Sequence, residues 1–270
     1  MSTVTTRVGA VAYEETGAGR PVVLLHATLH DRHDFDPVVD SLAEHHRVIA
    51  VDWPSHGESE FVENITGPLL ADVLEDVVDA LGLKDIVLIG NSVGGSAAAR
   101  LAITRPSLVA GLVLVNTGGF VPNTLPTRAF CRIMGTESVA RRVLPRFVKA
   151  YMKPRTESDE RIVEDVTARA RNREGVHTAA SMWRSFSTPE YDLRARAHLI
   201  TAPTLIVWGD RDPTLSARIG EATHKAIPHS GLHMLDTGHV VFSSEPGGFL
   251  RLVNPFLESI DASAAKWNSM

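Results

Sequence analysis

The chain has 270 residues, 44% of them hydrophobic and 22% charged, which is ordinary for a globular protein with a sizeable core. A formal net charge of −5 gives no reason to expect a nucleic-acid partner. No stretch reaches the ~20 apolar residues of a membrane span, and the N-terminus lacks the order of a secretory signal. We therefore expect a cytoplasmic protein without a membrane partner; Cys131 is the only cysteine, which excludes an internal disulfide.

The first part of the chain alternates between predicted strands and helices. Residues 3–15 indicate a β-hairpin or two short strands. Short apolar strands follow at 22–26, 48–51, 86–89 and 111–115, separated by helical patterns at 35–43, 69–81 and 92–105. This alternation is typical of a mostly parallel sheet with helices on both faces.

The alternation stops at Asn116. From Gly118 to His198 only helices are predicted, near residue 129 and at 139–150, 159–171 and 175–186. Strands at 204–209 and 232–235, with helices at 215–226 and 246–259, then resume the pattern, and we expect the polar tail 261–270 to fray. The predicted organisation is a core of residues 1–117 and 199–270 with an inserted helical cap of residues 118–198.

The predicted cap is basic. It has 15 Lys and Arg against 9 Asp and Glu, whereas the remainder has 12 against 23. Arginines on helices most often form a solvated face. The alternative interpretation is that one or two of them face the cleft and bind a carboxylate or phosphate of the substrate.

The sequence Gly90-Asn91-Ser92-Val93-Gly94 lies between an apolar strand and a small, Ala-rich helix. A sharp turn from strand to helix lifts the serine side chain above the sheet edge, where a substrate can reach it. Gly90 and Gly94 stand where a side chain would collide with the folded backbone or a neighbouring strand. The pattern predicts Ser92 as a nucleophile, with the N–H of Val93 at the helix start placed to hold negative charge.

A serine nucleophile needs a base, and the base needs a carboxylate to hold its tautomer. Asp210 and Asp212 follow the predicted strand 204–209, and His239 follows the strand 232–235. The carboxyl ends of parallel strands meet at one sheet edge, where ligands bind in open α/β sheets. Ser92, His239 and one of the aspartates can therefore converge.

With these residues, the chain from about residue 10 to 260 resembles the α/β-hydrolase family. The order Ser, Asp, His along the chain is the order found in that family. The resemblance implies an α/β fold with a mostly parallel eight-stranded sheet, helices on both faces and an inserted helical cap. Residues 52–59 are similar to its Asp-x-x-Gly-His-Gly-x-Ser loop, with Ser55 where glycine is usual. Residues 25–28 are similar to its His-Gly-x oxyanion loop, with Ala27 in place of glycine.

The resemblance also implies site roles. It makes Asp212, the second aspartate of Gly-Asp-Arg-Asp, the acid, and leaves Asp210 to cap the turn. Some members carry the acid after the sixth strand, where this chain has Asn116, which cannot stabilise a charged imidazole as a carboxylate does. The implied oxyanion hole consists of the backbone N–H groups of Thr28 and Val93, and the Cβ of Ala27 is expected to twist the loop that carries Thr28.

A second polar cluster contains three histidines and two aspartates: His26, Asp31, Asp34, His30 and His33. Their spacing alone allows a metal site, but the resemblance gives His26 a bracing role in the oxyanion loop. We expect no metal and no cofactor. We expect Cys131 to pack in the cap, because no strand and turn frame it as a nucleophile. Apolar residues that could line a pocket or belong to the core are Leu29, Trp53, Phe130, Met134, Met182, Trp183, Phe186 and Val240.

The leading functional hypothesis is a serine hydrolase of a small-molecule carboxylic ester, lactone or thioester. In it Ser92 attacks and forms an acyl-enzyme, His239 transfers the proton and Asp212 orients His239. The substrate is expected to be partly apolar, and nothing in the sequence predicts an oligomeric state. The presence of Ser92 at the nucleophile position argues against a nucleophilic-aspartate mechanism.

Two alternatives stay open. The elbow from Gly90 to Gly95 is similar to that of meta-cleavage-product hydrolases, which break a carbon–carbon bond, and a basic cap suits dicarboxylates. Those enzymes usually carry tryptophan after the histidine, where this chain has Val240, and a Gly-rich oxyanion loop. The other alternative is a ligand-binding protein with a slow or vestigial triad, favoured by Ala27 and Ser55 and opposed by the presence of all three triad residues.

Overall fold

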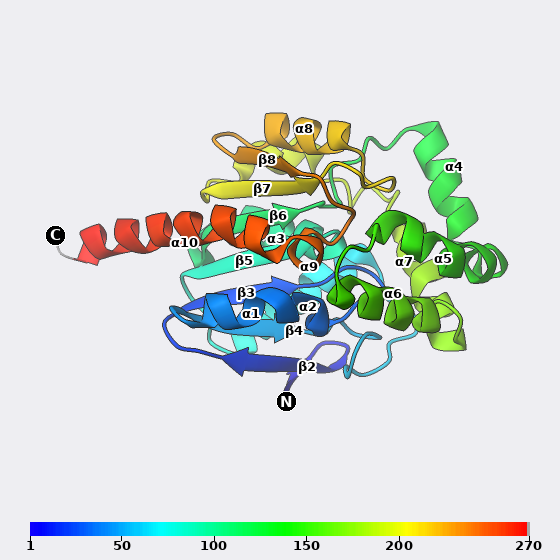
Figure 1. The fold of residues 1–270 in the computed structure, drawn as a ribbon, viewed down its shortest axis with the longest axis horizontal. Helices are drawn as coiled ribbons and strands as arrows, with labels where there is room; N and C mark the ends of the chain where they lie inside the picture. Colours follow the sequence, from blue (N-terminus) through cyan, green and yellow to red (C-terminus); the bar gives the residue numbers. More distant parts are fainter. Residues whose placement is uncertain (269–270) are drawn as a thin grey trace.

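The computed structural model describes residues 1–268, whose strands form one eight-stranded sheet in the order β1-β2-β4-β3-β5-β6-β7-β8. Strand β2 pairs antiparallel with both β1 and β4, and all other neighbouring strands pair in parallel, in agreement with the mostly parallel sheet that was predicted. The strands are β1 Ser2–Thr6, β2 Gly9–Thr16, β3 Arg20–Leu25, β4 His46–Val51, β5 Ile86–Asn91, β6 Val109–Val115, β7 Thr204–Gly209 and β8 Gly231–Leu235. Strands β5 and β7 are buried along their whole length because helices cover both faces of the sheet (Figure 1).

Each face of the sheet has its own hydrophobic cluster. On one face pack α2 (Gly67–Ala80), α3 (Val93–Thr104) and α8 (Ala217–Ala226). On the other pack α1 (Asp36–Ala43), α9 (Val241–Ser244) and α10 (Pro246–Asn268). Short 3-10 turns connect the elements at η1 Arg32–Phe35, η2 Pro106–Leu108 and η3 Arg194–Leu199. Within residues 1–268 no helix is both long and apolar enough to cross a membrane.

We call residues 118–198, which lie between β6 and β7, the cap segment. All of its regular secondary structure is helical. It contains α4 (Leu125–Met134), α5 (Glu137–Met152), α6 (Glu157–Arg169) and α7 (Arg173–Ser185). Polar side chains begin three of these helices, since Thr124, Thr156 and Asn172 accept hydrogen bonds from backbone N–H groups of the first turn. In Figure 1 these helices lie together at the carboxyl end of the parallel strands.

The end of the chain differs from the sequence prediction. The expected frayed tail 261–270 is wrong for residues 261–268, because α10 continues to Asn268; the last two residues lie outside the described part. Asp261 holds this helix to the core, accepting a bond from Arg20 Nε at 2.6 Å and lying 3.1 Å from His46 Nε2. Both partners are more than 200 residues away in sequence, so these contacts cannot be predicted from the local sequence around Asp261.

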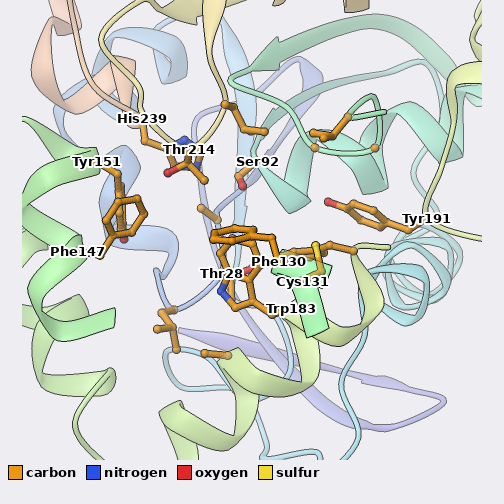
Figure 2. Close-up of a pocket in the computed structure, with 18 of the residues that line it drawn as sticks. Thr28, Ser92, Phe130, Cys131, Phe147, Tyr151, Trp183, Tyr191, Thr214 and His239 are labelled. Atoms are coloured by element: carbon orange, nitrogen blue, oxygen red, sulfur yellow. The ribbon is translucent and has the colours of Figure 1, made fainter. Parts of the chain in front are cut away.

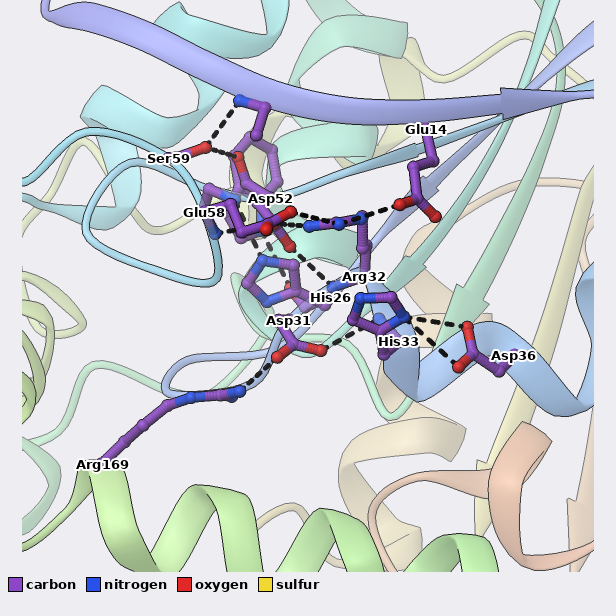
Figure 3. A network of polar contacts seen from close by, with 12 residues as sticks. Glu14, His26, Asp31, Arg32, His33, Asp36, Asp52, Glu58, Ser59 and Arg169 are labelled. Carbon is purple, nitrogen blue, oxygen red and sulfur yellow. Dashed lines mark hydrogen bonds and ion pairs between the residues drawn. The ribbon is translucent and has the colours of Figure 1, made fainter. Parts of the chain in front are cut away.

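A buried charged network fixes the loops that follow β3 and β4 (Figure 3). The guanidinium of Arg32, only 4% exposed, pairs with Asp52, Glu14 and Glu58. The backbone N–H of Arg32 also donates to Asp52 Oδ1 at 2.8 Å. Burial opposes the charge of Arg32, but these carboxylates outweigh it and raise the pKa of the guanidinium. Asp52 therefore joins the two loops through one residue.

Ser55 stands at a position where the backbone favours glycine. Its φ of 64° lies in the left-handed region, which accounts for the glycine usual in the resembling loop. The hydroxyl of Ser55 donates to Val62 O at 3.0 Å and accepts from Val62 N at 2.8 Å. These two bonds offset the backbone strain of the substitution.

Candidate active site

Ser92 lies at the sharp turn between β5 and α3, with φ 54° and ψ −115°. A Cβ at Gly90 would come within 2.5 Å of backbone atoms of Gly94 and Gly95, and one at Gly94 would collide with the carbonyl of Leu25. The steric reason predicted for both glycines is therefore confirmed. The turn strains Ser92, and strained turns of this kind present a side chain at a functional site.

Asp212 and His239 are hydrogen-bonded: His239 Nδ1 donates to Asp212 Oδ2 at 2.6 Å. Asp212 follows β7 and His239 follows β8, as the sequence predicts, and both side chains are buried. Asp210, by contrast, is exposed. The structure thus pairs the histidine with the second aspartate of the loop. Ser92 and His239 line the same pocket, where Figure 2 shows them facing the cavity.

A further residue, Asn116, holds the carboxylate of Asp212. Its Nδ2 donates to Asp212 Oδ2 at 2.8 Å, and its Oδ1 accepts from Gly209 N at 2.7 Å. Thr214 N donates to the other oxygen of Asp212 at 2.7 Å. Burial opposes ionisation of Asp212, but the charge and hydrogen bond of His239 and these backbone donors outweigh it and lower the pKa. Asn116 follows β6, and this position after a strand was the only feature of the sequence that indicated a role for Asn116 beside the acid.

Asn91 has a structural partner in the same site. Its side-chain Nδ2 donates to Val115 O and to His239 O, both at 3.0 Å. The residue before Ser92 therefore fixes the backbone of the loop that carries His239. This contact joins the elbow to a residue 148 positions away.

The predicted oxyanion loop borders the same pocket. Ala27 and Thr28 line it beside Ser92, and Leu29 has a left-handed φ of 69°. Within residues 1–268 the N–H groups of Thr28 and Val93 donate to no other group. Ala27 is only 2% exposed, and the residue with the left-handed backbone in this loop is Leu29, not Ala27. Both predicted donors are therefore unoccupied at the site.

His26 braces this loop as a neutral ring. Its Nδ1 donates to Ala27 O at 2.7 Å, while its Nε2 accepts from Trp53 N at 3.0 Å. Burial lowers the pKa of His26 to about 3, which keeps it uncharged at neutral pH. The bracing role implied for His26 agrees with these contacts.

The remaining histidines of the cluster separate. His30 is buried and bonds Asp34 and Tyr151, whereas the exposed His33 lies 3.3 Å from Asp36. In the part of the chain that the structure describes, no three His, Cys, Asp or Glu side chains are grouped to hold a metal ion.

The pocket is mainly apolar (Figure 2). Of the apolar residues suggested by the sequence, Leu29, Phe130, Trp183 and Phe186 line it, while Trp53, Met134, Met182 and Val240 are buried in the cores. Cys131 packs in the cap segment and also borders the pocket, and burial raises the pKa of its thiol. The sequence missed Tyr151, Tyr191 and Phe147, which line the pocket from the cap segment.

The basic residues of the cap segment do not line this pocket: among the described residues around it there is no lysine or arginine. Arg169 instead reaches the core, where it donates to Leu29 O at 2.9 Å and pairs with Asp31 (Figure 3). Arg155 pairs with Asp236 at 3.0 Å. The one carboxylate at the pocket besides the buried pairs is Asp192, bound by Arg194 at 2.7 Å.

Several known proteins are similar to this chain in sequence. A chain from Bacillus subtilis (strain 168), named putative 2-succinyl-6-hydroxy-2,4-cyclohexadiene-1-carboxylate synthase, is 30% identical over 93% of this chain and 95% of its own. A 2-hydroxy-6-oxononadienedioate/2-hydroxy-6-oxononatrienedioate hydrolase from Paraburkholderia phymatum is 31% identical over 83% and 82%.

Among solved structures, a thermophilic esterase from Thermogutta terrifontis superposes with a TM-score of 0.80 at 26% identity, covering 96% of this chain and 98% of that one. The family model for the alpha/beta hydrolase fold matches residues 20–246. With its eight-stranded sheet and this match over most of its length, the chain belongs to the α/β-hydrolase family.

Proposed function

We propose that the protein is a serine hydrolase that cleaves a small-molecule carboxylic ester, lactone or thioester through an acyl-enzyme on Ser92. The observation that carries the proposal is the His239–Asp212 hydrogen bond of 2.6 Å on the same pocket as the strained Ser92 elbow. A nucleophile, a base and an orienting carboxylate on one cleft are the groups that acyl transfer needs.

In the proposed reaction His239 Nε2 takes the proton of Ser92 Oγ as the oxygen attacks the carbonyl carbon. The negative oxygen that forms is held by the free N–H groups of Thr28 and Val93. His239 then gives its proton to the leaving oxygen or sulfur. Water next attacks the acyl carbon while His239 takes a proton from it, and Ser92 Oγ leaves with that proton as the acid is released. Asp212 stabilises the imidazolium while remaining ionised, consistent with its lowered pKa.

The pocket supports an uncharged substrate. Its lining offers aromatic and aliphatic surface together with threonine and tyrosine hydroxyls, and its described residues include no cation. A free carboxylate on the substrate would lose its hydration in this pocket without gaining a cationic partner, which costs several kcal/mol. We propose that the cap segment (residues 118–198) acts as a lid that supplies this apolar surface.

A carbon–carbon bond hydrolase is the second candidate, and the relatives favour it. One relative is named a hydrolase of dienedioates, which carry two carboxylates. Because the pocket presents no lysine or arginine, it suits such a substrate less well than an ester.

The deciding experiment compares wild type with Ser92→Ala on a panel of esters and thioesters of varied acyl length and on a vinylogous diketo acid. We expect ester turnover in the wild type, loss of activity in Ser92→Ala, and labelling of Ser92 by a fluorophosphonate probe. Full activity in Ser92→Ala would contradict the mechanism, and turnover of the diketo acid alone would favour the second candidate.

A matched pair of variants tests the acid. Asp212→Asn is expected to lower kcat by up to ~10⁴-fold, as for the equivalent change in a serine protease. Asp210→Asn, in the same loop but exposed, is expected to leave kcat within about threefold. Equal effects of the two substitutions would contradict the assignment of Asp212.

A further inference from the structure

A second histidine–aspartate pair borders the pocket, and the proposed reaction does not use it. His30 Nδ1 donates to Asp34 Oδ2 at 2.5 Å, and the two side chains are 0% and 3% exposed. His30 Nε2 lies 2.9 Å from the hydroxyl of Tyr151. Both His30 and Tyr151 line the pocket, so this chain of three groups ends at the cavity.

Tyr151 also contacts the proposed base. It lies on α5, with its ring edge-on to the ring of His239 at 5.5 Å and 83°. Its carbonyl accepts from His239 N at 3.0 Å. In Figure 2 the two residues project into the cavity from neighbouring elements. The side chain of Tyr151 thus lies on the wall of the pocket beside His239, which gives its proton to the leaving group in the proposed reaction, and its hydroxyl is held by His30.

The hydrogen-bonding capacity of these groups leaves one acceptor free. With the proton of the His30–Asp34 hydrogen bond on Nδ1 of His30, Nε2 is the acceptor for the phenol hydrogen. Burial raises the pKa of Tyr151, which keeps the phenol protonated. A phenol oxygen that donates its hydrogen to His30 still has a lone pair, which can accept one hydrogen bond from a ligand.

A simple tether between core and cap segment would not explain this arrangement. Burying an ionisable carboxylate is costly, and burial raises the pKa of Asp34, so the pair opposes folding unless its groups are well bonded. Apolar contacts would join α5 to the core at lower cost. A histidine that a carboxylate holds in one tautomer, by contrast, fixes the direction of the hydroxyl that it bonds.

We propose that Tyr151, positioned by His30 and Asp34, binds a hydroxyl group on the alcohol part of the substrate. The proposal rests on the ester hydrolase function above and narrows its substrates to esters of hydroxylated alcohols with an apolar acyl group. Tyr151 contacts the substrate, whereas His30 and Asp34 act through Tyr151 as positioning residues.

Two isosteric esters test this specificity. The 2-hydroxyethyl and n-propyl esters of one apolar acid differ by a hydroxyl in place of a methyl group. After correction for their rates of hydroxide-catalysed hydrolysis, we expect wild type to show about tenfold higher kcat/KM for the hydroxyethyl ester, the effect of about one hydrogen bond. Tyr151→Phe should bring the ratio close to one, mainly by raising KM for the hydroxyethyl ester.

The positioning residues have a matched control. Asp34→Asn should reduce the same ratio partly, because a neutral amide polarises His30 less than a carboxylate does. Asp36→Asn, which touches the exposed His33, should leave the ratio unchanged. A structural role alone would lower the melting temperature or kcat for both esters equally without changing the ratio.

The outcomes separate the two proposals. Equal wild-type kcat/KM for the two esters overturns the role of Tyr151, even if Tyr151→Phe does not fold. Turnover of both esters that survives Ser92→Ala overturns the serine mechanism, whatever the ratio. No turnover of either ester overturns both.

Discussion

At the residue scale, Asn116 shows how a neutral side chain supports the proposed acid. It donates to the oxygen of Asp212 that also accepts from His239, and it accepts from Gly209 N. Asn116→Ala removes a donor and leaves the buried N–H of Gly209 without its partner, costs of about 1–3 kcal/mol each. We expect kcat to fall about tenfold and the melting temperature to fall by several degrees. Steady-state kinetics and thermal unfolding measure the two effects, and unchanged values of both would contradict this role.

The role of a site residue was predictable where the sequence of one short segment around it determines that role. Ser92 and its flanking glycines belong to one turn, and Asp212 and His239 follow strands that are recognisable by themselves. Tyr151 and His30 were not predictable in this way, because their contact joins residues 121 positions apart. Asn116 was noticed as a position without a carboxylate, but its contact with Asp212 depends on how β6 and β7 pair.

At the element scale, the end of α5 is built against the loop that carries His239. A Cβ at Gly238 would collide with the carbonyl of Met152 and come within 2.5 Å of the carbonyl of Tyr151. Gly238→Ala should push α5 away and break the bond from His239 N to Tyr151. We expect a loss of about 1–3 kcal/mol of unfolding free energy and more than a tenfold drop in kcat.

Gly231→Ala is the control for that change. Gly231 begins the same strand, β8, and a Cβ there would meet only Leu205 at 3.9 Å, an ordinary contact. Its stability and kcat should stay near the wild-type values. If both alanine variants behaved alike, the close packing of α5 on the His239 loop would not be what limits activity.

Element types were more predictable than element ends. The strand predicted at 204–209 has the same bounds as β7, because six apolar or small residues stand between Pro203 and the loop. The last helix was predicted nine residues too short, since its extension depends on Asp261 meeting Arg20 and His46. The short α9 was missed because its four residues are too few to show a helical period.

At the scale of the whole molecule, two buried neutral histidines couple stability to pH. Burial lowers the pKa of His26 and of His56 to about 3, and their rings lie 5.3 Å apart. In the unfolded chain each pKa returns to about 6.5. The folded state therefore binds fewer protons than the unfolded state between these values, so its stability is complete above pH 6.5 and falls as the pH is lowered toward 3.

Below pH 6, each of these histidines makes the unfolding free energy fall by up to about 1.4 kcal/mol for every unit by which the pH is lowered. Replacing His56 by Gln removes one titrating group and should flatten the dependence of unfolding free energy on pH by about that amount between pH 6 and 4.5. Urea unfolding at several pH values measures these slopes. An identical slope in His56→Gln would mean that this ring already becomes protonated in the folded protein, and that the core beneath the oxyanion loop is open to water.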